Sequence, residues 1–162
     1  MNEVDAKETI WGHVTNISTC MMVARDGDWV RARPMRGIAK PDENEIWFIT
    51  DRETSIGSEV SDDPRCCLTY CDTKTQAYVS LSGQMSVVDD PSVLGRLWSE
   101  GAEAYFPHGP NDPAAILLKF VPEIAQYWET PSSPILIAIN FLQAKLTGQR
   151  PELGSSGTAR LS

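Results

Sequence analysis

The stretch NISTCMMVARDGDWVRARPM, residues 16–35, contains two β-rich runs on either side of an Asp-Gly pair. An Asp-Gly pair between two apolar runs is a strong signal for a tight β-hairpin. It predicts antiparallel strands over residues 16–25 and 29–39. Pro34 has no backbone N–H to donate within a sheet, so the second strand is expected to carry a bulge or to lie at a sheet edge.

The rest of the chain alternates short strand-like segments with a few helical ones. The predicted further strands are residues 46–50, 65–71, 76–88 and 115–121, the last extended towards 125–129 beyond a break at Pro122. Helices are predicted over residues 2–11, 55–61 and 135–146, and from Pro91 with an apolar face of Leu94, Leu97 and Trp98. We therefore predict a mainly β fold with α decoration, built as a six-stranded antiparallel barrel.

The length of the chain predicts its domain organisation, and its charge excludes some classes of partner. The 162 residues predict one domain over 1–148, followed by a polar, mobile tail over 149–162. The formal charge of −8 argues against nucleic acid and against an anionic membrane surface as partners. No apolar run is long enough for a membrane span, and the first residues do not resemble a secretory signal.

The cysteines and histidines predict neither a disulfide framework nor a metal site. Cys66 and Cys67 are adjacent, which places them on opposite faces of a strand. His13 and His108 are far apart, and no cysteine has zinc-site spacing. Reduced thiols in a cytoplasmic protein without a metal are therefore expected.

Three arginines lie within six residues of an acidic chain, at positions 31, 33 and 36. On a strand, Arg31 and Arg33 share one face and repel each other unless an anion or a carboxylate lies nearby. From composition alone, pairing with the chain's own carboxylates and binding of an external anion are equally good interpretations. Thr50, Thr54 and Ser55, at a strand end that leads into a helix, favour the second interpretation and predict a site for a phosphate monoester.

An ordered series of motifs extends this prediction. The motifs are RARPM (31–35), IWFIT (46–50), TSIGSEVSDDPRCCLTY (54–70), YVSLSGQMSVVDD (78–90), LW (97–98), YFPHGPNDP (105–113) and LLKFVPEIAQYWE (117–129). Together they resemble the general stress protein group of the pyridoxamine 5′-phosphate oxidase-like, FMN-binding split barrels, over roughly residues 5–150. The resemblance implies a split barrel that forms a homodimer, with FMN at the subunit interface.

The resemblance also implies how the phosphate end of FMN is held. Arg33 would contact the phosphate, Arg31 could assist, and Ser55 matches the hydroxyl beside it. The family usually places a lysine two residues after this serine, but the chain has Gly57 there. Loss of one charge-assisted contact costs about 1.5–3 kcal/mol. FMN binding is therefore expected to be weak, to depend on Arg31, Arg33 or Arg52, or to have been replaced by binding of another ligand.

Further residues correspond to family positions near the flavin ring and the ribityl chain. These are Pro34, Met35, Ile49, Thr50, Tyr78 and Trp98. No catalytic acid or base is identified, which suits hydride transfer to a flavin. We expect a flavin-dependent oxidoreductase of unassigned substrate. A non-catalytic flavin carrier or stress sensor is the alternative, and a barrel for another anionic cofactor, such as a deazaflavin or haem, is a third interpretation.

Overall fold

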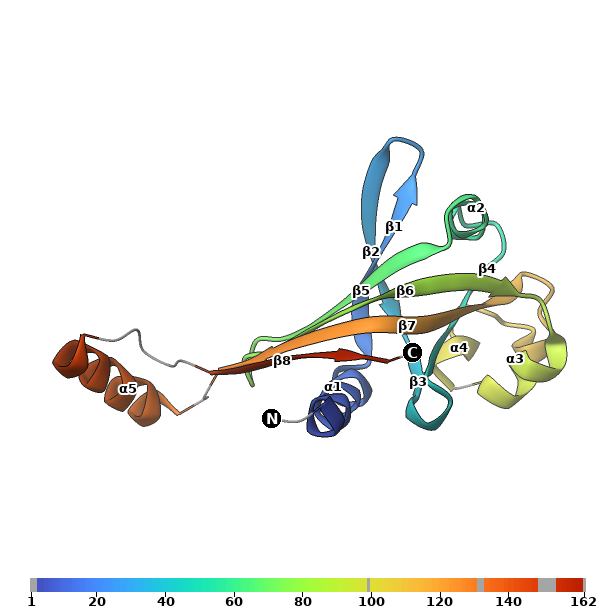
Figure 1. The fold of residues 1–162 in the computed structure, drawn as a ribbon. Coiled ribbons are helices and arrows are strands. Elements are labelled where there is room, and N and C mark those ends of the chain that lie inside the picture. Colours follow the sequence, from blue (N-terminus) through green and yellow to red (C-terminus); the bar gives the residue numbers. More distant parts are fainter. Residues whose placement is uncertain (1–2, 99, 131–132, 149–153, 162) are drawn as a thin grey trace.

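In the computed structural model, which describes residues 3–98, 100–130, 133–148 and 154–161, eight strands form one antiparallel sheet (Figure 1). The strand order is β2-β1-β5-β6-β7-β4-β3, and β8 pairs with β7. The strands are β1 (Thr19–Asp26), β2 (Trp29–Arg36), β3 (Ile38–Lys40), β4 (Glu45–Asp51), β5 (Arg65–Asp72), β6 (Ala77–Val88), β7 (Ala115–Glu129) and β8 (Ser155–Arg160). The mainly β class is confirmed, whereas the predicted number of six strands is corrected to eight among the described residues.

The connection between β2 and β3 curls this sheet into a barrel. The two strands are at opposite ends of the strand order, yet only Gly37 separates them in sequence. The two edges must therefore approach each other, as in a split barrel. A Cβ atom at position 37 would lie 2.9 Å from the Ile46 side chain and 3.0 Å from Phe48, so this close approach favours glycine.

The β1–β2 hairpin forms as the Asp-Gly signal predicts. Asp26 pairs with Trp29, which leaves a two-residue turn at Gly27 and Asp28. Pro34 pairs with Met21 within an uninterrupted register. Since β2 is the edge strand of the sheet, the edge position is the correct one of the two alternatives for this proline.

The predicted break at Pro122 is wrong, because β7 runs through this residue without interruption. A bulge accommodates the proline: Ser82 pairs with Ile124, and Gly83 pairs with Pro122. A Cβ atom on Gly83 would lie only 2.2 Å from the carbonyl oxygen of Val121. The glycine and the bulge together allow β6 to follow a strand that lacks one N–H donor.

The helices lie around the sheet, except that the last of them projects away from it (Figure 1). They are α1 (Glu3–Ile17), α2 (Ile56–Asp62), α3 (Pro91–Leu97), α4 (Glu100–Glu103) and α5 (Pro134–Thr147), with short 3₁₀ turns at Pro41–Glu43 and Gly109–Asn111. The helices predicted at 55–61, from Pro91 and at 135–146 are confirmed. No helix among the described residues is long and apolar enough to span a membrane.

The first helix is longer than predicted. Residue 2 of the predicted helix lies outside the described residues, and α1 continues to Ile17. The predicted strand start at residue 16 is therefore wrong. Ile10 and Val14 are fully buried one turn apart, so packing extends the helix into a segment whose composition favours a strand.

The predicted mobile tail is also corrected. Residues 149–153 lie outside the described residues, but β8 pairs with β7 from Ser155 to Arg160. Ala159 and Leu161 are buried. β4 and β8 share one edge of the long β7, because β4 pairs with its first half and β8 with its second. The free half of that edge supplies the partner that β8 needs.

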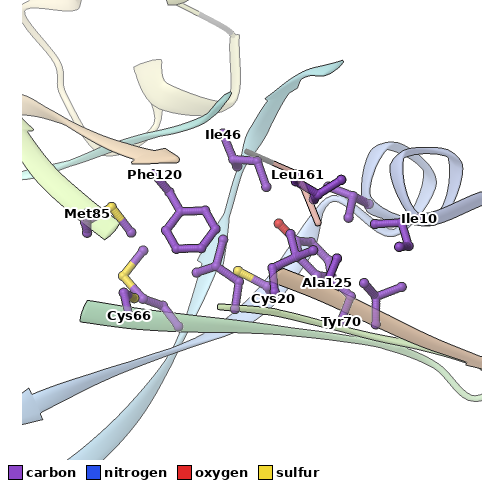
Figure 2. Close-up of a cluster of buried hydrophobic side chains, with 14 of the residues drawn as sticks. Ile10, Cys20, Ile46, Cys66, Tyr70, Met85, Phe120, Ala125 and Leu161 are labelled. Carbon is purple, nitrogen blue, oxygen red and sulfur yellow. The ribbon is translucent and has the colours of Figure 1, made fainter. Parts of the chain in front are cut away.

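Two apolar clusters form the core. The larger one lies between α1, α2 and the inner face of the sheet, where Ile10, Tyr70 and Phe120 are almost completely buried (Figure 2). The smaller cluster gathers Trp47, Leu94 and Leu117 beneath α3. Successive residues of β4 point alternately into the two clusters.

Candidate functional site

Edge strand β2 carries the arginines on the inner face of the sheet. Arg31 and Arg33 pair with Ala24 and Met22, which are both buried. Residues directly opposite in an antiparallel pair share a face, so the predicted common face of the two arginines is confirmed. This face looks towards α2, which packs on β1 and β6.

Helix α2 supplies the polar groups that meet Arg33. Ile56 and Val60 are buried in the larger core cluster. Glu59 lies beside them on the same helix face, with only 3% of its side chain exposed. Ser55 stands at the N-cap position, yet its hydroxyl accepts no hydrogen bond from the α2 backbone.

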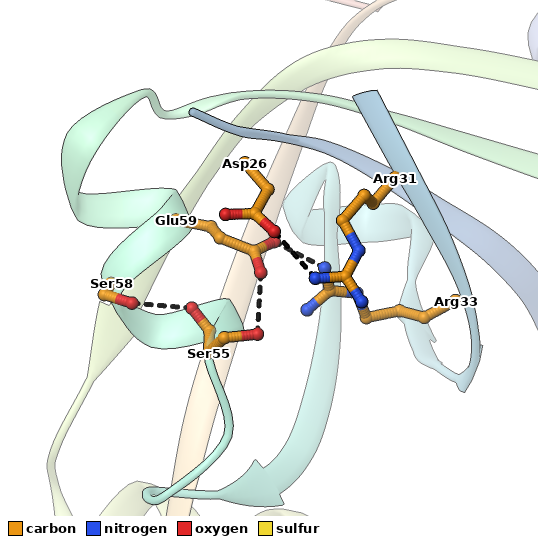
Figure 3. A network of polar contacts seen from close by, with 6 residues as sticks. All are labelled: Asp26, Arg31, Arg33, Ser55, Ser58 and Glu59. Atoms are coloured by element: carbon orange, nitrogen blue, oxygen red, sulfur yellow. Dashed lines mark hydrogen bonds and ion pairs between the residues drawn. The ribbon is translucent and has the colours of Figure 1, made fainter. Parts of the chain in front are cut away.

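Arg33, Glu59 and Ser55 form one hydrogen-bonded network (Figure 3). Arg33 Nη2 donates to Glu59 Oε2 over 2.5 Å, and Ser55 Oγ donates to Glu59 Oε1 over 2.7 Å. Ser58 Oγ donates to the backbone carbonyl of Ser55 over 2.8 Å. Each carboxylate oxygen of Glu59 thus accepts one of the two donors predicted to hold a phosphate.

The other arginines of the predicted anion site are also paired, but in exposed positions. Arg31 Nη1 donates to Asp26 Oδ2 over 2.7 Å, and this bond raises the pKa of Arg31. Arg52 makes two bonds to Asp89, of 2.7 and 2.9 Å, which lower the pKa of that carboxyl group. Pairing with the chain's own carboxylates, the first of the two interpretations, therefore describes Arg31 and Arg33, and it extends to Arg52.

The chain is similar to proteins of one family. The family model described as pyridoxamine 5′-phosphate oxidase like matches residues 5–152. The chain belongs to the pyridoxamine 5′-phosphate oxidase-like family. The resemblance drawn from the motifs is thereby confirmed. A comparison with curated proteins gave no match.

Solved structures agree on the fold. A provisionally named general stress protein 26 from Jannaschia sp. CCS1 is 26% identical, with a TM-score of 0.77, and the match covers 98% of this chain and 99% of that one. The general stress FMN/FAD binding protein from Xanthomonas citri is 25% identical, with a TM-score of 0.72 and coverage of 80% and 92%. A Clostridium acetobutylicum protein related to general stress protein 26, at 22% identity, a TM-score of 0.70 and coverage of 80% and 91%, has the same fold.

The residues predicted near the flavin ring do not converge within one chain. Met35 is half-buried and packs against the larger core cluster, while Pro34 is exposed on the opposite face of β2. Ile49 and Trp98 pack in the smaller cluster, where Trp98 stacks at a tilt on Phe106. The role of these residues as flavin contacts remains a prediction, and so does the role of Arg33 and Ser55 as phosphate contacts.

Two further predicted residues lie on different faces of the sheet. Thr50 is buried on β4. Tyr78 pairs with Cys71 and Trp128, which are both exposed, on the outer face of β6. Arg33 lies on the inner face, so Arg33 and Tyr78 lie on opposite faces of the sheet.

In this arrangement Glu59 already uses the two donors that were predicted to hold the FMN phosphate. The Ser55 hydroxyl has one proton, which it donates to Glu59, and Arg33 directs Nη2 to the same carboxylate. A phosphate between Arg33 and Ser55 would meet the negative charge of Glu59 at close range. Arg33 and Ser55 are brought together as predicted, but Glu59 lies between them.

Glu59 is the site residue that the sequence prediction missed. The signal was present, because positions 56, 59 and 60 follow the spacing of a buried helix face, and position 59 is charged. A carboxylate on a buried helix face requires a partner. Arg33 on β2 supplies this partner.

Proposed function

We propose that this member of the pyridoxamine 5′-phosphate oxidase-like family is a flavin-binding oxidoreductase whose cofactor is FMN and whose substrate is unassigned. The observation that carries the proposal is the meeting of Arg33 and Ser55. The sequence predicts both as phosphate contacts, and β2 and α2 bring them onto one carboxylate. That a relative of 25% identity is an FMN/FAD binding protein adds support.

In this proposal the chain binds and orients, while the bound flavin supplies hydride or electron transfer. The inner face of β2 and the start of α2 would receive the phosphate end. Thr50 is buried near the end of β4 and precedes the loop to α2, so in this proposal it would lie between the ring end and the phosphate end of the flavin.

A second candidate function is a non-catalytic flavin carrier or sensor. The network is compatible with both functions, because Arg33 and Ser55 each donate a hydrogen bond to Glu59 and hydride transfer to a flavin needs no acid or base beside it. Reduction of the bound flavin distinguishes the two functions. Rapid bleaching by NADH or NADPH supports the oxidoreductase, and flavin that stays oxidised supports the carrier.

The test of flavin binding is a visible absorption spectrum of the purified protein, repeated after addition of excess FMN and desalting. Retained absorbance near the flavin bands is the expected result. A colourless protein that also shows no heat of FMN binding by calorimetry contradicts the proposal.

We also propose that the chain works as a homodimer. Helix α5 projects away from the sheet, beyond the ends of β7 and β8 (Figure 1). Its exposed apolar side chains are Ile135, Ile139, Phe141, Leu142 and Leu146. A nearly uncharged helix with this much exposed apolar surface requires cover, and a second copy of the chain, as the family resemblance implies, would supply it.

The mass in solution tests the homodimer. We expect twice the chain mass of 17.9 kDa by light scattering, and loss of the dimer when Phe141 and Leu142 are both changed to Asp. Changing the exposed Tyr105 to Asp, outside α5, serves as the control and should leave the dimer intact. A monomeric wild-type protein contradicts the proposal.

A cytoplasmic location is proposed from the thiols. All four cysteines are free, as expected for a reducing compartment. Cell fractionation with an antibody against the chain tests the location, and recovery outside the cytoplasmic fraction contradicts it.

A further inference from the structure

We infer that Glu59 acts as an internal substitute for the ligand phosphate, so that the Arg33–Ser55 site discriminates weakly between a flavin with a phosphate and one without it. The inference rests on the proposed flavin function, whose phosphate contact it describes. Glu59 is the residue that sets the specificity of the site.

The geometry gives Glu59 both contacts that a phosphate would need. Its two carboxylate oxygens lie 2.5 Å from Arg33 Nη2 and 2.7 Å from Ser55 Oγ. Such charge-assisted bonds are the usual way in which a phosphate is held. An incoming phosphate must therefore displace the carboxylate or share its donors.

Burial holds Glu59 in this position. Only 3% of its side chain and 21% of the Arg33 side chain are exposed. Ile56 and Val60, on the same face of α2, are anchored in the core. A buried carboxylate that loses its partner suffers a large desolvation penalty, so Glu59 competes strongly for Arg33.

The surroundings supply no excess of positive charge. The pocket between the β1–β2 hairpin and α2 is lined by the carboxylates of Asp26, Glu59, Asp62 and Asp63 and by the guanidinium groups of Arg25 and Arg65. Arg65 is held by Asp63 over 2.7 Å, and Arg31 is held by Asp26. With Arg31 and Arg33 included, four cations face four anions, so a phosphate dianion gains little from the local field.

Position 57 offers the means to restore a cation. A Cβ atom at Gly57 would have only the Ile116 side chain near it, at 4.0 Å. Its backbone is in the ordinary helical region, since α2 includes this residue and its φ is not positive. A lysine side chain therefore fits at position 57.

The experiment compares the dissociation constants of FMN and riboflavin, which differ by the phosphate, for wild type, Glu59→Gln and Gly57→Lys. For wild type we expect an FMN preference below about tenfold, since less than one full charge-assisted contact is available. Glu59→Gln removes the charge but keeps the shape. It should strengthen FMN binding about tenfold to a hundredfold and change riboflavin binding less than about twofold.

Matched variants separate the charge effect from general disturbance. Gly57→Lys should raise the FMN preference and Gly57→Ala should not, because only the lysine adds a cation. Arg33→Ala in the Glu59→Gln background should abolish the gained preference. Circular dichroism verifies that each variant is folded.

A second measurement does not depend on flavin binding. The side-chain ¹⁵N resonances of Arg33 are followed while inorganic phosphate is added at millimolar concentration. They should shift in Glu59→Gln and stay unchanged in wild type. If no variant binds FMN or riboflavin but the phosphate shift appears only in Glu59→Gln, the proposed flavin function fails and the role of Glu59 stands.

Two results overturn the inference. One is a wild-type preference for FMN over riboflavin above about a hundredfold, which would mean that Glu59 does not obstruct the phosphate. The other is a Glu59→Gln variant that is folded but shows neither a gain in FMN preference nor a phosphate-dependent shift. The wild-type ratio decides the matter even if Glu59→Gln does not fold.

Discussion

Arg31 and Arg33 lie two residues apart on the same face of β2, and each contacts one carboxylate, yet their surroundings differ. The Arg31–Asp26 contact is 2.7 Å long with 59% and 40% of the two side chains exposed. The Arg33–Glu59 contact is 2.5 Å long with 21% and 3% exposed. The two distances are nearly equal, so distance alone would predict that the two pairs contribute equally to stability. Burial separates them, because water screens the first pair and is excluded from Glu59.

The largest expected effect comes from removing one partner of the buried pair. Arg33→Ala leaves the Glu59 charge buried with only Ser55 beside it, and we expect a loss of about 3–5 kcal/mol in the free energy of unfolding. Urea unfolding followed by fluorescence measures it. A loss below about 1 kcal/mol would place this pair in the same class as an exposed one.

Replacing both partners sharpens the same comparison. The double variant Arg33→Met, Glu59→Leu removes the buried charges together, so stability should return to within about 1 kcal/mol of wild type. The same urea titration measures the recovery. A double variant as unstable as Arg33→Ala would show that the site needs its polar groups for packing and not for charge balance.

Burial should also make the four thiols differ in their effect on the pH dependence of stability. It raises the pKa of Cys20 to about 11 and that of Cys66 to about 12, from an ordinary value of 9.0. A raised pKa of an acid means that the folded state favours the neutral thiol. This stabilisation is complete below about pH 9 and is lost as the pH rises towards about 11 and 12.

The thermal midpoint, measured from pH 8 to 11, checks this prediction. It should fall above about pH 9, and Cys66→Ala should make the fall less steep. Cys71 is exposed, so Cys71→Ala should leave the steepness unchanged. Equal effects of the two variants would rule out burial as the cause.

The smallest effect is expected for the exposed pair. Arg31→Ala should leave the unfolding midpoint unchanged within error, since exposed ion pairs contribute little. A measurement in low and high salt checks it, and a clear salt-dependent loss would show that Arg31 is coupled to the Arg33–Glu59 pair.

Local signals made much of the fold predictable. The Asp26-Gly27 turn, the edge position of Pro34 and the start of α3 at Pro91 each depend on a few neighbouring residues. The formation of β8 does not depend on neighbouring residues alone, because residues 155–160 pair with an edge of β7 that exists only in the folded sheet. The extension of α1 to Ile17 likewise depends on burial of Val14.

In the candidate site, too, some features follow from local sequence and others depend on the folded structure. The shared face of Arg31 and Arg33 follows from strand geometry, and the nearness of Ser55 follows from the order of the motifs. The role of Glu59 depends on which helix face turns inward and which strand lies opposite, across 26 residues of sequence. The sequence is compatible both with pairing of the arginines to the chain's own carboxylates and with binding of an external anion. In the folded chain, a carboxylate of the chain lies at the place where the anion was expected.

The ratio of FMN to riboflavin affinity for the wild-type protein, measured by calorimetry at one salt concentration, tests the central claim most directly. If Glu59 holds the place of the phosphate, the ratio is below about ten. A ratio above about a hundred would contradict the account, because the phosphate would then obtain full contacts at a site that Glu59 was inferred to fill.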